Sequence, residues 1–91
     1  MIGRRIRIFG TVQGVFFRAW TVQQAQLIGI KGWVRNRLDG TVEVEAWGEE
    51  GAVARLIESL GQGPSNASVD RIGVEEIEGE APPGFRSAPT L

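Results

Sequence analysis

The fold of this chain is decided by a stretch that joins a strand-like pattern to a helix-like one: Gly10-Thr11-Val12-Gln13-Gly14-Val15-Phe16-Phe17-Arg18. Immediately before it, isoleucines alternate with arginines over residues 5–10, which predicts a strand with one apolar face. From Phe17 to Ile28, apolar and small side chains recur at helical spacing, and Gly29 follows as a left-handed cap. We therefore expect a strand, a glycine loop and a helix over residues 17–28.

Four further elements follow along the chain. Residues 31–37 and 41–48 are typical of two strands, joined by a turn at Leu38-Asp39-Gly40 that suits positive φ. Apolar residues at i, i+3, i+4 and i+7 from Val53 to Leu60 predict a second helix, with Gly61 as its stop. A polar loop over residues 62–68 then precedes a strand over residues 69–77.

The order β-α-β-β-α-β is that of a split βαβ unit with two right-handed crossovers. We expect an α+β, ferredoxin-like sandwich, in which both helices pack on one face of an antiparallel sheet. With 91 residues, the chain is expected to form one domain over residues 1–91. The proline-containing segment 80–91 is either a loosely ordered tail or a short edge strand.

The composition limits the chemistry available to the chain. It contains no histidine and no cysteine, which removes the commonest general bases, nucleophiles and metal ligands. No apolar run is long enough to span a bilayer, and the N-terminus alternates like a strand and does not resemble a signal peptide. We expect a cytoplasmic protein without a membrane partner.

The charges are divided along the chain. The first 38 residues hold seven cations and no acid, whereas all 11 acids lie from Asp39 onward. Either this asymmetry attracts anions toward the first loop, or the arginines on one strand pair with glutamates on its neighbour. For Arg5 and Arg7 we favour cross-strand pairs.

The glycine loop has the features of an anion site. A helix start presents unpaired N–H groups and a positive dipole end, Gly14 permits the turn, and Arg18 adds a guanidinium. In a split βαβ unit the first two strands run parallel, so Asn36, near the end of the second predicted strand, should lie close to this loop. An arginine and an amide can hold an anion and orient a water, but neither accepts a proton at neutral pH.

Three segments together resemble the acylphosphatase family: Val12-Gln13-Gly14-Val15-Phe16-Phe17-Arg18, Gly29-Ile30-Lys31-Gly32-Trp33-Val34-Arg35-Asn36 and Asp39-Gly40-Thr41-Val42-Glu43. The resemblance covers about residues 5–78, and the family has the βαββαβ fold. It implies hydrolysis of acyl phosphates to a carboxylate and inorganic phosphate by a monomer that uses no metal or organic cofactor. By position it implies that Arg18 binds phosphate and that Asn36 orients water. It also implies that the substrate phosphate is bound by Gln13, Gly14, Val15, Phe16, Phe17 and Arg18.

Two alternatives stay open from the sequence. A ferredoxin-like module that binds phosphate without catalysis would keep the same loop, and hydrolysis of a small acyl phosphate would distinguish the two. RNA-recognition modules share the topology, and Arg5, Arg7 and Phe9 face away from the isoleucines. However, the aromatic signature of those modules is missing and the net charge is −1, so we expect no nucleic-acid partner.

Overall fold

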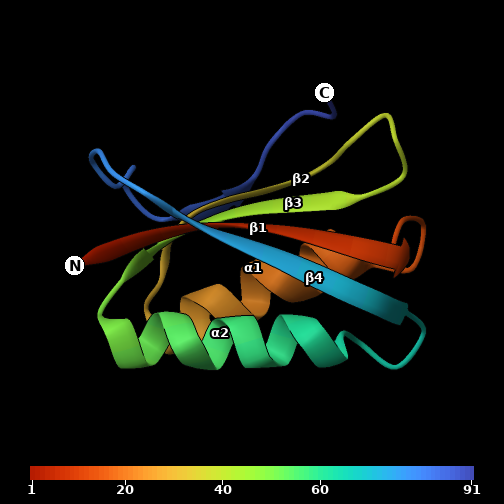
Figure 1. Cartoon of the computed structure of the whole chain (residues 1–91), viewed down its shortest axis with the longest axis horizontal. Coiled ribbons are helices and arrows are strands. Elements are labelled where there is room, and N and C mark those ends of the chain that lie inside the picture. The colour runs from red at the N-terminus through yellow and green to blue at the C-terminus, as the bar shows by residue number, and fades with distance from the viewer.

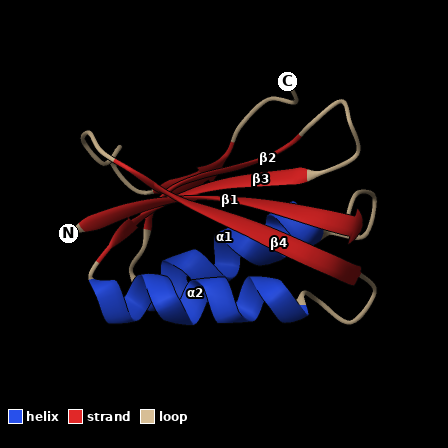
Figure 2. Ribbon diagram, viewed as in Figure 1, coloured by secondary structure: helices blue, strands red, loops and turns tan.

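The computed structural model describes residues 1–91 as one five-stranded sheet with two helices on one face (Figure 1). Figure 2 shows the helical layer on one side of the sheet, while the other face carries no helix. This arrangement confirms the predicted ferredoxin-like α+β fold. The elements are β1 (Ile2–Thr11), α1 (Phe17–Ile28), β2 (Lys31–Asn36), β3 (Val42–Gly48), α2 (Glu50–Gln62), β4 (Ser68–Ile77) and β5 (Phe85–Ser87).

The strand order is β4-β1-β3-β2-β5. Because β1 and β2 each pair antiparallel with β3, they run parallel to each other, as the sequence predicts. The ends of β1 and β2 that lead into the glycine loop and the β2–β3 turn therefore lie at the same edge of the sheet. The sheet is antiparallel across four strands, and β5 adds a parallel pairing with β2 at the outer edge.

The core lies between the sheet and the helices. Ile6 pairs with Val44 and Ile8 with Val42 across the central strands, and all four side chains are completely buried. Alternation places the residues between them on the open face, as expected for a sheet with one covered side. The helices contribute Phe17, Ala25, Val53, Leu56 and Leu60 to the same core.

Both helices end at a glycine with positive φ. Helix α1 has the predicted bounds, and Gly29 caps it at φ 88° with its N–H bonded to Ala25 O. The predicted stop of α2 is wrong: Gly61 lies inside the helix, and the cap is Gly63, at φ 71°. A glycine inside a helix costs only about 1 kcal/mol of stability relative to alanine. Burial of the neighbouring Leu60 outweighs this cost, so the helix continues beyond Gly61. Neither helix has the length and hydropathy of a bilayer span.

The C-terminal segment forms the short edge strand that the sequence left undecided. Phe85 is buried in the core, at 6% exposure, and Gly32 N–H donates to Gly84 O at 2.9 Å. Beyond β5, Ala88 N–H donates to Val34 O, and the backbone of Leu91 bonds to Leu38 and Asn36. The segment from Phe85 onward is thus fastened along β2, although a strand of three residues is too short to show alternation in the sequence.

This attachment predicts a large effect from one side chain in the tail. We expect Phe85→Ala to lower the free energy of unfolding by about 3 kcal/mol, because truncating a buried phenylalanine removes apolar burial and leaves a cavity. Arg86→Ala, at the exposed neighbouring position, should change it by less than about 0.5 kcal/mol. Urea unfolding followed by tryptophan fluorescence measures both; equal midpoints would show that the tail contributes nothing to the core.

Candidate active site

The loop between β1 and α1 is held in place at both ends and in the middle. Val12 and Phe17 are buried in the core on either side of it. Between them, Gln13 Nε2 donates to the carbonyl oxygens of Arg37 and Thr41, each at 2.8 Å. The Gln13 amide therefore links the loop directly to the β2–β3 turn, beside the strand end that carries Asn36.

The backbone of this loop turns twice into the left-handed region. Gly14 has φ 75°, and Phe16, which precedes the first residue of α1, has φ 60° and ψ 22°. Left-handed residues next to right-handed ones aim successive N–H groups to one side and create a concavity for anions. The first turn of α1 has no side-chain cap and no acidic residue, so its N–H groups remain available.

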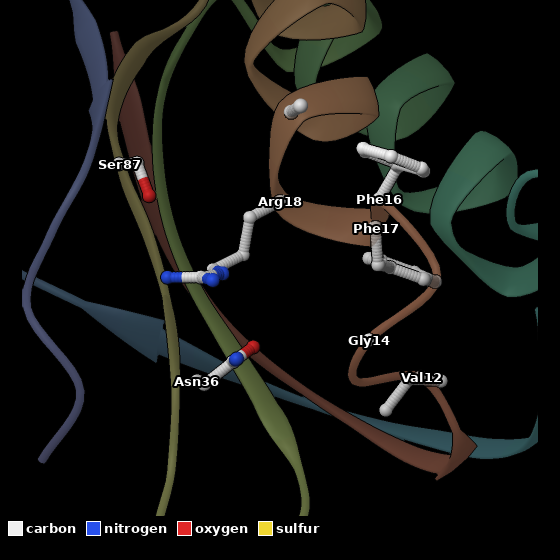
Figure 3. Close-up of a pocket in the computed structure, with 8 residues that line it drawn as sticks. Val12, Gly14, Phe16, Phe17, Arg18, Asn36 and Ser87 are labelled. Carbon is white, nitrogen blue, oxygen red and sulfur yellow. The ribbon is translucent and has the colours of Figure 1, made fainter.

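Arg18 and Asn36 line one pocket together with Gly14 of this loop. Figure 3 shows Arg18 extending from the first turn of α1 toward β2, where Asn36 projects from the strand end. Both line a pocket of about 420 Å³, which we call the loop pocket. None of the salt bridges in the molecule involves Arg18. Asn36 Oδ1 is buried and has no hydrogen-bond partner.

The loop pocket includes most of the predicted site residues and some that were not predicted. Its lining consists of Val12, Gly14, Phe16, Phe17, Arg18, Ala19, Asn36 and Ser87. Gln13 and Val15, both predicted to bind phosphate, are not part of this lining, and the Gln13 side chain is occupied by the β2–β3 turn. Ser87 was missed because nothing in the sequence of the tail indicates that β5 pairs with β2 beside the loop.

The acylphosphatase family model matches residues 4–87. The chain belongs to the acylphosphatase family. An acylphosphatase of Rhizorhabdus wittichii is 48% identical over 90 residues, covering 99% of this chain and 91% of that protein. One of Rhodospirillum rubrum is 45% identical, covering 94% of each chain. The solved structure of an acylphosphatase from Coxiella burnetii superposes with a TM-score of 0.92 at 37% identity, covering 96% of this chain and 92% of that one.

The open face of the sheet in this acylphosphatase fold carries a cluster of ion pairs around Glu43. Its side chain is 5% exposed and accepts from Arg35 Nε at 2.8 Å and Arg37 Nη1 at 3.2 Å. Arg7 and Arg5 approach the other carboxylate oxygen at 3.5 and 3.8 Å. Arg5 also pairs with Glu45 and Glu75, which confirms the predicted cross-strand pairing of Arg5 and Arg7.

This cluster shifts the titration of its central carboxylate. Burial alone would raise the pKa of Glu43, but the hydrogen bond from Arg35 and the positive charges of Arg35, Arg37 and Arg7 outweigh it and lower the pKa below its ordinary value. Asp39 lies in the β2–β3 turn, and its pKa is also lowered, first by the hydrogen bond from the Thr41 hydroxyl. Both carboxylates are therefore ionised at neutral pH, and they neutralise the arginines of the open face.

The lowered pKa of Glu43 predicts a specific pH dependence of stability. Since the folded-state pKa lies below the unfolded one, ionised Glu43 contributes its stability above about pH 4.5 and loses it as the pH falls through the folded value. We expect Glu43→Gln to unfold more easily at pH 7 by about 3 kcal/mol, since it leaves several arginines without their carboxylate.

The difference between wild type and Glu43→Gln should shrink as urea unfolding is repeated from pH 7 to pH 3. Glu58→Gln, at an exposed position without a salt bridge, is the control and should follow the wild type at every pH. A constant difference between wild type and Glu43→Gln across this range would contradict the assignment.

Proposed function

We propose that this chain hydrolyses acyl phosphates to a carboxylate and inorganic phosphate in the loop pocket. The observation that carries the proposal is that Arg18, which has no acidic partner, and Asn36, whose buried Oδ1 has no hydrogen-bond partner, line the same pocket as Gly14 of the loop. Membership of the acylphosphatase family supports the same reaction. Residues 1–91 would act as one domain.

The phosphoryl group would be held by positive charge and backbone donors. The first turn of α1 has no side-chain cap, so we expect backbone N–H groups between Gln13 and Arg18 to donate to the phosphate. The Arg18 guanidinium, which extends toward β2 (Figure 3), would donate to it as well. A planar guanidinium donates two parallel hydrogen bonds to a phosphate, which fixes its orientation. These donors also meet the charge that spreads over the equatorial oxygens in the transition state of phosphoryl transfer.

Asn36 would position the water that attacks phosphorus. Its Oδ1 accepts a hydrogen bond from this water, whose oxygen forms a bond to phosphorus while the bond between phosphorus and the acyl oxygen breaks. The electron pair of the broken bond stays on the leaving carboxylate, and the water proton passes to a phosphate oxygen of the substrate. A carboxylate is a weak base, so no general acid is required.

The same proposal covers the state and location of the protein. All eight residues of the loop pocket come from one chain, so a monomer is sufficient to form the site. A cytoplasmic location agrees with a chain that has no cysteine. Size-exclusion chromatography with light scattering tests the monomer directly.

Replacing the arginine should remove activity. Arg18→Ala is expected to lower kcat/KM for benzoyl phosphate by about a hundredfold or more, corresponding to roughly 3 kcal/mol of lost transition-state stabilisation. Competitive inhibition by inorganic phosphate should weaken in the same variant, because the guanidinium also holds the ground-state anion. Arg55→Ala, on the exposed side of α2, is the matched control and should retain wild-type kinetics.

Replacing the asparagine should affect the chemical step and leave phosphate binding intact. Asn36→Ala is expected to lower kcat by about a hundredfold, while the inhibition constant of inorganic phosphate stays close to that of the wild type. A urea midpoint near the wild-type value would show that the variant is folded. Turnover of benzoyl phosphate equal to the wild type would overturn the proposed role of Asn36.

A further inference from the structure

Ser87 joins the loop pocket from the last strand of the sheet. In the parallel pairing of β5 with β2, it lies beside Val34. The backbone on both sides of it is fixed, because Gly32 N–H donates to Gly84 O at 2.9 Å and Ala88 N–H donates to Val34 O at 2.8 Å. The sheet therefore sets the position of Ser87 relative to the rest of the pocket.

The side chain of Ser87 points to the helix side of the sheet. Phe85, two residues earlier on β5, is buried in the core, and side chains two residues apart on a strand share a face. Figure 3 shows the Ser87 hydroxyl directed toward the side chain of Arg18, which extends from α1. Arg18, Asn36 and Ser87 are the three residues with polar side chains in the lining of the loop pocket.

The hydroxyl of Ser87 is not used by the fold. It forms no hydrogen bond within the chain. The nearby Oδ1 of Asn36 also has no partner, so the two groups are not bonded to each other. Val34 and Phe85, its neighbours on the same face, are apolar and buried, so packing does not require a polar group here. The hydroxyl is therefore free to bond a ligand.

The chemistry of Arg18 limits what this hydroxyl can bond. The Arg18 side chain forms no salt bridge and no hydrogen bond within the chain. A guanidinium has five N–H donors and no acceptor, so it cannot take the proton of a hydroxyl beside it. That proton stays available to an acceptor that the guanidinium itself attracts, and an anion is such an acceptor.

We propose that Ser87 is a further phosphate-binding residue, whose hydroxyl donates a hydrogen bond to an oxygen of the phosphoryl group held by Arg18. This step rests on the proposed function, in which Arg18 binds the phosphate of the substrate. The charge of the phosphoryl group is spread over three equatorial oxygens, whereas a guanidinium bonds two acceptors at once. Ser87 adds a donor from β5, while the other donors come from the loop and the first turn of α1.

The test compares two replacements of nearly equal shape, one with a hydroxyl and one without. Ser87→Thr keeps the hydroxyl, Ser87→Val replaces it with a methyl group, and both residues are β-branched and suit a strand. We expect Ser87→Val to raise the inhibition constant of inorganic phosphate and the KM for benzoyl phosphate about fivefold, the effect of one lost hydrogen bond. Both constants should stay within about twofold of the wild type in Ser87→Thr.

Ser68→Val is the matched control, because Ser68 is an exposed serine on the edge strand β4 and lies outside the loop pocket. It should leave both constants unchanged. Equal inhibition by phosphate in Ser87→Val and Ser87→Thr would overturn the proposal, since the hydroxyl would then make no difference. A raised KM for benzoyl phosphate with unchanged inhibition by phosphate would also overturn it, because the hydroxyl would then bond the acyl group.

Titration calorimetry with inorganic phosphate separates this proposal from the proposed function, because it measures binding without turnover. A wild type that binds phosphate but does not hydrolyse benzoyl phosphate would contradict the proposed function. The comparison of phosphate affinity between Ser87→Val and Ser87→Thr would still decide the role of Ser87.

Discussion

The register of the central strands is the constraint on which the rest of the structure depends. Ile6 opposite Val44 and Ile8 opposite Val42 place every second side chain of β1 and β3 under the helices. Since β2 is paired to β3 in the same way, Asn36 lies opposite Val42 and shares the covered face. A slip of one residue would turn Asn36 to the open face, away from Arg18, so the packing of four aliphatic side chains also aligns the site.

The two faces of the sheet use their arginines differently. On the open face, Arg5, Arg7, Arg35 and Arg37 are held by Glu43 and its acidic neighbours, so the excess of positive charge in the first part of the chain is largely neutralised. Arg18 lies at the sheet edge on the helix side and forms no salt bridge. Its charge is therefore available to an anion, which is the condition that electrostatic catalysis without a histidine or cysteine requires.

The loop combines rigid anchors with an unfavourable exposed residue. Val12 and Phe17 are fixed in the core, and Gln13 binds two carbonyl groups of the β2–β3 turn, so the loop and Asn36 form one rigid unit. Within this unit Phe16 is both left-handed and exposed. Such strain costs free energy, and it persists here because the contacts on either side of Phe16 fix the backbone.

Periodicity, glycine caps and the order of elements were enough to determine the ferredoxin-like fold, the bounds of α1 and the approach of Arg18 to Asn36. These features depend on local propensity and on the parallel course of β1 and β2. The residue pattern determines the first, and the order of the elements along the chain determines the second. The attachment of β5, the stop of α2 at Gly63, the engagement of Gln13 and the pairing of Glu43 with several arginines were decided only by the tertiary structure. They join residues that are distant in the chain, or they depend on packing that overrides a local signal, and no periodic pattern encodes such contacts.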